Sequence, residues 1–304
     1  MSNRSARIGQ NMRLTSLTDP EIPSITQLPH GTPARNKHEW RPAHISAKFH
    51  RMEWDAPAII LDVRPYNEGD ALATVMTEAH GMHRGLARGG ASRSKAATWQ
   101  PGNLVQVQWT ARLSDQLGSF TGELIHAGAA HAMQEAMPLA MLTAICAIAE
   151  GALPEREPLP RIFDGLLHLI PRLPLGEALL TDQIQWELVV LSDLGYGLDL
   201  STCAVTGKTE NLTYVSPKTG RAVTDEAAGD WAARLLPLPR FLTGQAPPDL
   251  TGWRDGLRLT GHFLARDAFG NQHRPLPQAR RMLYDRVSTM VAQQEKDVAS
   301  KNAG

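Results

Sequence analysis

Cysteine is scarce in this chain of 304 residues, which contains only Cys146 and Cys203. The two lie far apart in unlike contexts, which favours a reducing cytoplasm over a disulfide framework. Cys146 lies in an apolar helical run and is predicted to be a small buried hydrophobic residue. The sequence also lacks a run of about eighteen apolar residues, so we expect no membrane span and no membrane partner.

The motifs of the common enzyme classes are missing as well. The sequence has no P-loop, no dinucleotide fingerprint, no Gly-x-Ser-x-Gly elbow and no His-Glu-x-x-His. His80 and His83 flank a glycine in a predicted turn with no third ligand nearby, which argues against a metal site. Cys203 has no histidine in its local stretch and is predicted to be a structural thiol. We therefore expect a protein that is not an enzyme and that uses no cofactor and no metal.

A surplus of either charge is also missing. The formal net charge is +0, so an argument for nucleic acid must rest on how the charges are distributed. Residues 79–114 contain no aspartate or glutamate. Cations in such a stretch can neutralise phosphates, and its glycines let the backbone approach a ligand closely. The alternative is a solvated surface loop. The candidate DNA-binding cations are Arg84, Arg88, Arg93, Lys95 and Arg112.

Aromatic residues make up only 6% of the chain, so DNA binding by this stretch is predicted to depend mostly on charge. Trp99 lies in a loop and is the better candidate for stacking on a base. Trp109 shares a strand face with Val105 and Val107 and is predicted to be core. Arginines of the second half are predicted to line a solvated helix face, with an extended DNA track as the alternative. They are Arg254, Arg258, Arg266, Arg274, Arg280, Arg281 and Arg286.

The hydrophobic period changes once along the chain. Residues 56–127 follow a strand pattern with five short strands and no helix between them, which is typical of a small closed barrel. From residue 130 the period is helical, and helices are predicted near 133–148, 160–170, 181–194, 257–268 and 277–293. The boundary between the two domains falls near Gly128. Residues 1–51, rich in proline and arginine, are predicted to be a disordered or non-native extension, with a basic nucleic-acid-binding arm as the alternative.

The stretch from about 200 to 225 is built like a zinc ribbon that has lost its ligands. A zinc knuckle needs a second cysteine three positions after Cys203, and Thr206 stands there instead. A hairpin is predicted at 212–223, with its turn at 217–220, and no further cysteine follows it. The ribbon is therefore predicted to be metal-free and held together by packing around Leu212, Tyr214 and Val223.

Several turns and helix ends accompany this ribbon in a fixed order, at 52–64, 78–90, 100–103 and 194–200. Their combination resembles the RecO family of bacterial recombinational repair proteins over residues 52–290. The resemblance implies an α+β multidomain fold. An OB-fold at 52–128 would be followed by a mostly α-helical domain at 129–296, which carries the metal-free, zinc-ribbon-like hairpin.

The resemblance also implies a function. RecO-like proteins are mediators of DNA repair and homologous recombination that bind single- and double-stranded DNA and anneal complementary single strands. With RecR they help to load the recombinase onto DNA coated by single-stranded DNA-binding protein. The helical domain is expected to bind the acidic C-terminal tail of that protein, in a nucleoid-associated, cytoplasmic setting. The missing zinc ligands and the extension at 1–51 depart from the family pattern.

Two other functions remain open from the sequence alone. The barrel could be a protein-interaction module that contacts a protein partner without binding DNA. A hydrolytic or nucleolytic enzyme would instead need clustered carboxylates and a divalent metal.

Overall fold

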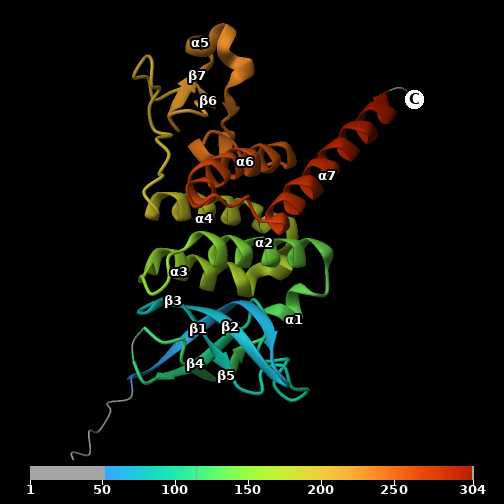
Figure 1. Cartoon of the computed structure of the whole chain (residues 1–304). Coiled ribbons are helices and arrows are strands. Elements are labelled where there is room, and N and C mark those ends of the chain that lie inside the picture. Colours follow the sequence, from blue (N-terminus) through green and yellow to red (C-terminus); the bar gives the residue numbers. More distant parts are fainter. Residues whose placement is uncertain (1–51, 114, 303–304) are drawn as a thin grey trace, which may run out of the picture. The chain divides into compact units, whose positions relative to one another are not determined.

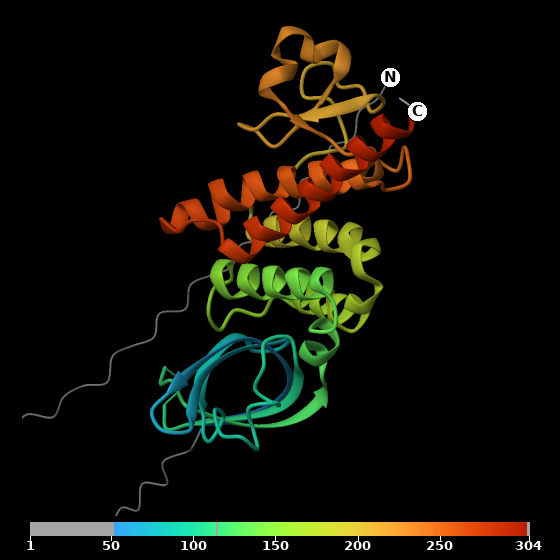
Figure 2. The ribbon, with the colours of Figure 1, turned by 90° about the vertical axis from the view of Figure 1, so that its right-hand side faces the viewer.

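The computed structural model describes residues 52–113 and 115–302, and its first part is a five-stranded barrel (Figure 1). The strands are β1 (Met52–Tyr66), β2 (Asp70–Thr77), β3 (Gly81–Ala87), β4 (Leu104–Ala111) and β5 (Ser119–His126). They close in the order β1-β2-β3-β5-β4, and Figure 2 shows the ring end-on. The prediction of a closed barrel is confirmed. The prediction for residues 1–51 lies outside the described residues.

Small residues make room for aromatic rings inside this barrel. Ala58, Ala71 and Ala73 are fully buried on strands β1 and β2. Gly85 of β3 faces the ring of Phe120, which a β-carbon at this position would approach to 2.6 Å. Trp109 of β4 is buried, as its place in the alternating pattern predicts. The barrel interior thus combines three large rings, Trp99, Trp109 and Phe120, with small and β-branched side chains.

The second part is mostly helical, as predicted. Its long helices are α2 (Ala136–Ala152), α3 (Pro160–Leu169), α4 (Leu180–Asp193), α6 (Leu250–Phe263) and α7 (Gln278–Asn302). Short helical turns connect them: α1 (Gly128–Ala132), η1 (Ile170–Leu179), α5 (Asp225–Ala228), η2 (Gly229–Arg234), η3 (Arg240–Thr243), η4 (Leu264–Phe269) and η5 (Gly270–Gln272). Helix α2 packs against β1 on one side and against α7 on the other, so it links the barrel to the later helices (Figures 1 and 2).

Two predicted helix boundaries are wrong. Helix α6 begins at Leu250 rather than near 257, because Asp249 caps it by accepting a hydrogen bond from the Gly252 N–H at 2.6 Å. Helix α7 continues to Asn302 rather than ending near 293. Its last turns carry no apolar periodicity, so the apolar pattern gives no sign of them, although alanine, lysine and glutamate favour a helix there.

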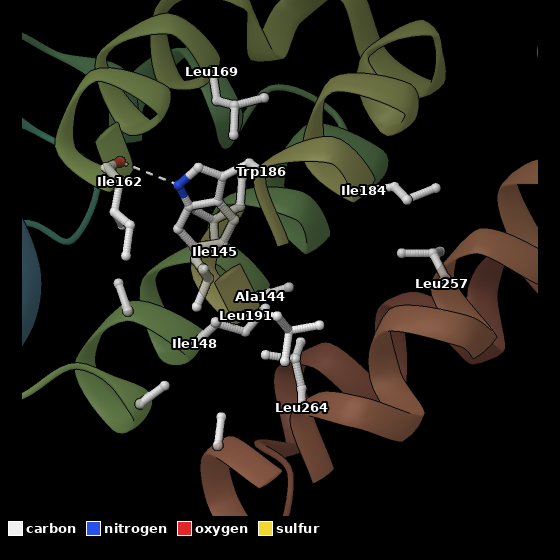
Figure 3. Close-up of a cluster of buried hydrophobic side chains, with 14 of the residues drawn as sticks. Ala144, Ile145, Ile148, Ile162, Leu169, Ile184, Trp186, Leu191, Leu257 and Leu264 are labelled. Atoms are coloured by element: carbon white, nitrogen blue, oxygen red, sulfur yellow. Dashed lines mark hydrogen bonds between the residues drawn. The ribbon is translucent and has the colours of Figure 1, made fainter. Parts of the chain in front are cut away.

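One continuous core runs from the outer face of the barrel through the helices. Ile59 and Met76 of the barrel belong to the same buried cluster as Ile145 of α2 and Trp186 of α4. Figure 3 shows the Trp186 indole donating a hydrogen bond to the Ile162 carbonyl oxygen, at 3.2 Å. Burying this indole requires that its polar N–H find a partner. The core therefore specifies the orientation of α4 against α3.

The ribbon is a three-stranded sheet in the order β7-β6-β8, with β6 (Leu212–Val215), β7 (Ala222–Thr224) and β8 (Leu236–Pro237). The predicted hairpin is confirmed, and β8 adds a strand that the sequence pattern does not indicate. Cys203 is buried, and its sulfur accepts a hydrogen bond from the Thr224 N–H at 3.4 Å. Within the described residues no three potential metal ligands come together, so the residues present do not fit the ligand set of a zinc ribbon.

A buried ion pair joins three helices of the second part. Arg280 of α7 is only 1% exposed, so its prediction as part of a solvated helix face is wrong. Its guanidinium donates to both carboxylate oxygens of Glu187 of α4, at 2.6 and 2.8 Å. It also donates to the Leu257 carbonyl and the Thr260 hydroxyl of α6, at 2.8 and 3.1 Å. The side chain is drawn inward because Glu187 and α6 offer it partners that satisfy its charge.

Replacing Arg280 by alanine should leave the buried Glu187 carboxylate without its counter-ion. We expect Arg280→Ala to lower the free energy of unfolding by about 3–5 kcal/mol, measured by urea denaturation. The double variant Glu187→Leu with Arg280→Met removes both charges together and should recover most of that loss. A loss below about 1 kcal/mol for Arg280→Ala would contradict this assignment.

Candidate nucleic-acid interface

A basic loop, residues 88–95, follows β3 and is anchored to the turn between β1 and β2. The Asp70 carboxylate accepts a hydrogen bond from the Gly89 N–H at 2.7 Å. The Ala91 N–H donates to the Gly69 carbonyl at 3.0 Å. Gly89 has a φ of +68°, which a side chain rarely tolerates, so this glycine is needed for the turn. The loop therefore has a defined backbone that can present its side chains in a fixed direction.

The cations of the basic loop point into solvent. Arg88, Arg93 and Lys95 are all exposed. Within the described ranges, no carboxylate forms an ion pair with any of them, and Lys95 reaches only the Arg88 carbonyl, at 3.4 Å. Arg112, one residue beyond β4, is exposed in the same way. These four predicted cations are thus available to phosphates, although they lie on two separate loops.

Arg84 differs from the other predicted cations. It lies on β3, and its guanidinium is bound to Glu150 of α2 at 3.0 Å and to Glu155 at 2.5 Å. Arg64 and Arg274 approach the same Glu150 carboxylate, at 3.8 and 4.0 Å. Arg84 therefore joins the barrel to the helical part, and its predicted role as a DNA contact does not fit this pairing. Sequence reasoning missed these partners because they lie 66 and 71 residues away along the chain.

Trp99 does not fit its predicted role in stacking either. Its side chain is 4% exposed. The indole stacks on Phe120 inside the barrel, with centroids 6.1 Å apart and planes 24° apart. The small residues that line the interior leave room for it, and the Asn103 amide fixes the segment before it by donating to the Ala97 and Thr98 carbonyls. A base cannot reach either face of this ring.

A different set of rings reaches the surface where β1 begins. Trp54 of β1 stacks with two other rings, the buried Trp109 of β4 and His80 of the β2–β3 turn. The centroids are 5.8 Å apart for Trp54 and Trp109, with planes 18° apart. They are 4.6 Å apart for Trp54 and His80, with planes 16° apart. We call Trp109, Trp54 and His80 the ring stack. One signal in the sequence could have indicated Trp54, because it falls at the same period-two positions of β1 as the interior residues Ala58 and Ile60.

His83 packs edge-on against Trp54 and Trp109 beside the ring stack. Burial, and next the positive charge of Arg156, lower the pKa of His83 to about 4. Burial also lowers the pKa of His80. Both imidazoles are therefore neutral near pH 7. No cluster of three potential metal ligands exists in the part of the chain that the structure describes, and His83 Nδ1 is buried with no hydrogen-bond partner.

A short segment after α2 closes against this end of the barrel. The Arg156 N–H donates to the Met82 carbonyl at 2.8 Å, and its guanidinium donates to the Gln116 carbonyl at 3.1 Å. A β-carbon on Gly81 would lie 2.0 Å from the Glu157 carbonyl oxygen, so only glycine allows this contact. The segment brings the guanidinium of Arg156 close to the ring stack.

The arginines of the helical part are mostly paired. Arg254 binds Asp255 and Arg266 binds Asp267, at 2.9 and 2.7 Å. Arg274 reaches Glu150, and Arg280 is buried against Glu187. Arg258, Arg281 and Arg286 are exposed, and none of the described carboxylates pairs with them. A continuous DNA track over this part would therefore have few cations at its disposal.

The neutral, buried state of His83 makes stability depend on pH. The unfolded chain takes up this proton near pH 6.5 and the folded chain only near pH 4. Between these values the unfolded state binds more protons, so folding is weakened as the pH falls. We expect a loss on the order of 3 kcal/mol from this residue, measured by urea denaturation at several pH values. His83→Phe should show a flatter profile from pH 6.5 to 4, and an unchanged slope would contradict the buried neutral ring.

Within the described residues, none of the helices combines the length and the apolar character that crossing a bilayer requires.

Comparison with known proteins gives the same answer for both parts of the chain. Residues 52–127 match the family model for the N-terminal part of recombination protein O, and residues 136–275 match the model for its C-terminal part. A DNA repair protein RecO from Granulibacter bethesdensis is 57% identical over 242 residues, which cover 79% of this chain and 97% of the relative. One from Gluconacetobacter diazotrophicus is 53% identical over 245 residues, covering 79% and 96%. One from Acidiphilium cryptum is 52% identical over 241 residues, covering 78% and 96%. The resemblance seen in the sequence is thereby confirmed, and the chain belongs to the RecO family of DNA repair proteins.

Proposed function

We propose that this chain binds DNA through the basic loop on its barrel and acts as a non-catalytic mediator of recombinational repair. The observation that carries the proposal is the contrast among its arginines. Those at the seam between barrel and helices are paired with carboxylates, whereas Arg88, Arg93 and Lys95 are exposed on a segment free of acidic residues. Unpaired cations on a fixed backbone suit phosphate binding.

The barrel topology supports this proposal. A five-stranded closed barrel in the order β1-β2-β3-β5-β4 has the strand number of an OB-fold, which binds oligonucleotides across strands 2 and 3 and the adjoining loops. The basic loop leaves β3 and is hydrogen-bonded to the β1–β2 turn. Its cations therefore lie beside the surface that OB-folds use for single strands. The barrel topology resembles that of nucleic-acid-binding OB-folds, and the exposed cations of the basic loop are the feature of this chain that favours DNA binding.

Annealing would follow from charge alone. Two complementary strands repel each other through their phosphates, and cations that neutralise both backbones lower this barrier without making or breaking a bond. The proposed mediator would thus need no cofactor. It would act in the cytoplasm at the nucleoid, with RecR and the recombinase as further components.

The acidic tail of single-stranded DNA-binding protein is the other proposed partner. A groove of about 930 Å³ lies between α2 and α7. Leu139 and Ala140 of α2 and Met282 and Met290 of α7 give it an apolar lining, and Arg286 and Asp285 place one charge of each sign along it. The apolar lining suits the hydrophobic part of such a peptide, and Arg286 offers a partner to one of its carboxylates. We propose this α2–α7 groove as the tail site.

The basic loop can be tested by neutralising Arg88, Arg93 and Lys95 to alanine together. Fluorescence anisotropy of a labelled single strand should show at least a roughly tenfold loss of affinity at about 0.1 M salt. The slope of log affinity against log salt should fall by about 2, since each lost contact with a single strand removes about 0.7. Unfolding midpoints should stay at the wild-type value because these side chains are exposed.

A variant with Lys218, Lys296 and Lys301 changed to alanine is the matched control, since these cations are equally exposed but lie far along the chain. Equal losses in both triple variants would mean that only net charge matters. Weak DNA binding by the wild type, insensitive to salt, would instead favour the protein-interaction module.

The α2–α7 groove can be tested by changing Met282 to glutamate. The new carboxylate would repel an acidic peptide, so we expect the affinity for a labelled tail peptide to fall at least about tenfold in a polarisation assay. Met282 is 59% exposed, so little stability should be lost. Val298→Glu places the same charge on the same helix, at a residue 52% exposed that does not line the groove. Wild-type affinity in Met282→Glu would exclude this groove.

A further inference from the structure

We propose that the ring stack at the mouth of the barrel receives a base of single-stranded DNA on the outer face of His80. This inference rests on the proposed DNA-binding function and gives it a second contact of a different kind. The basic loop holds phosphates, whereas the ring stack would hold a base. The geometry of the rings, the side chains around them and the charges nearby support this second contact.

The geometry is that of an unfinished stack. Trp109 is buried, whereas Trp54 and His80 are half-buried. Trp54 stacks with Trp109 and with His80, at centroid distances of 5.8 and 4.6 Å, and its plane lies within 18° of the plane of each of these rings. The rings thus lead from the buried Trp109 to half-buried rings at the surface. A nucleobase has the shape and π-face to continue such a series, and stacking accepts any base.

The rings are held in place rather than free to collapse. The indole N–H of Trp109 donates to the Leu117 carbonyl at 3.1 Å. The backbone N–H of His80 donates to the Thr77 hydroxyl at 3.0 Å, which fixes the turn that carries the ring. His83 supports Trp54 from the side. Because these side chains are already ordered, little free energy is lost in ordering them when a ligand binds.

The surroundings suit a single strand. The loop between β4 and β5 exposes Leu113 and Leu117, whose apolar side chains we expect to cover the edge of a base. Arg112 is exposed on the same loop, one residue beyond the pair of Met52 with Ala111. The Arg156 guanidinium is bound to the Gln116 carbonyl of this loop. Arg112 is thus an exposed cation on the loop that Arg156 binds, and we expect a flanking phosphate of the stacked base to contact it.

The two acidic residues that flank Trp54 on β1 do not oppose this arrangement, whereas Glu78 in the turn that carries His80 and Asp115 in the β4–β5 loop are exposed. Glu53 and Asp55 are the neighbours of Trp54 on β1, and alternation along a strand turns their side chains to the opposite face. Asp55 accepts a hydrogen bond from Gln106 on that outer face. The neutral state of both imidazoles near pH 7 makes the ring stack a surface for stacking rather than a second ionic site.

The inference predicts a difference between single and double strands. Bases in a duplex are already stacked and paired, so only a single strand offers a base to His80. We expect His80→Ala to weaken binding of a labelled oligo-dT about fivefold, which is the contribution of a modest stacking contact. Binding of a duplex of equal length should not change. His80→Phe keeps a flat ring and should restore the affinity for the single strand.

His131→Ala is the matched control, because this exposed histidine contacts His126 and not the ring stack. Photocrosslinking locates the contact independently: a strand carrying iodouracil should crosslink to His80 or Trp54 in the wild-type protein.

Each other outcome overturns the inference in a recognisable way. If His80→Ala binds the single strand as the wild type does, while the basic-loop variant loses affinity, the rings are core packing alone and the proposed function stands. If His80→Ala and His80→Phe lose affinity equally, the contact depends on the imidazole nitrogen and not on stacking. If His80→Ala keeps its affinity for DNA but loses its affinity for RecR, the ring stack is a contact surface for a protein partner. If the wild type binds no DNA, the proposed function and this inference fail together.

Discussion

The pairing of Glu187 with Arg280 is the constraint on which the helical part depends. Two charges in a dry interior are tolerated only when each is neutralised and its hydrogen-bonding groups are satisfied. Here one guanidinium satisfies a carboxylate of α4 and two acceptors of α6 while it belongs to α7. The pair therefore ties α4, α6 and α7 together at one buried point, in addition to the apolar contacts among these helices.

The buried pair lies next to a surface that the proposed function uses. Arg280 stands between Ala279 and Met282, which both line the α2–α7 groove, so its pairing with Glu187 holds this wall of the groove in place. Helix α2 in turn carries Glu150, which gathers Arg64, Arg84 and Arg274 at the seam with the barrel. One helix thus supplies a wall of the groove and the anchor of the barrel. The position of the barrel is determined by charge pairing as well as by the shared apolar core.

The sequence allowed the architecture to be predicted well, and the pairing of charges poorly. Period-two and helical patterns located the five strands and the main helices, because the spacing of apolar residues within a short window shows which side chains are buried. The predicted core position of Trp109 was right for the same reason. Arg84, Arg280 and Trp99 were misjudged because their partners are remote in sequence: Glu150 and Glu155 for Arg84, Glu187 for Arg280 and Phe120 for Trp99. A long-range partner leaves no local pattern, so an arginine on a loop and one in a buried ion pair look alike.

The same distinction supports the proposed DNA binding by a chain of zero net charge. Whole-chain charge averages paired and unpaired groups, but only an unpaired cation releases counterions when it meets a phosphate. Where the barrel meets the helices, Arg84 pairs with Glu150 and Glu155. On the basic loop, Arg88, Arg93 and Lys95 form no ion pair with a carboxylate of the described residues. Asp70 contacts this loop through the Gly89 backbone N–H rather than through a cation. Asp70 therefore orders the loop without lowering its positive charge, which is what a phosphate-binding surface requires.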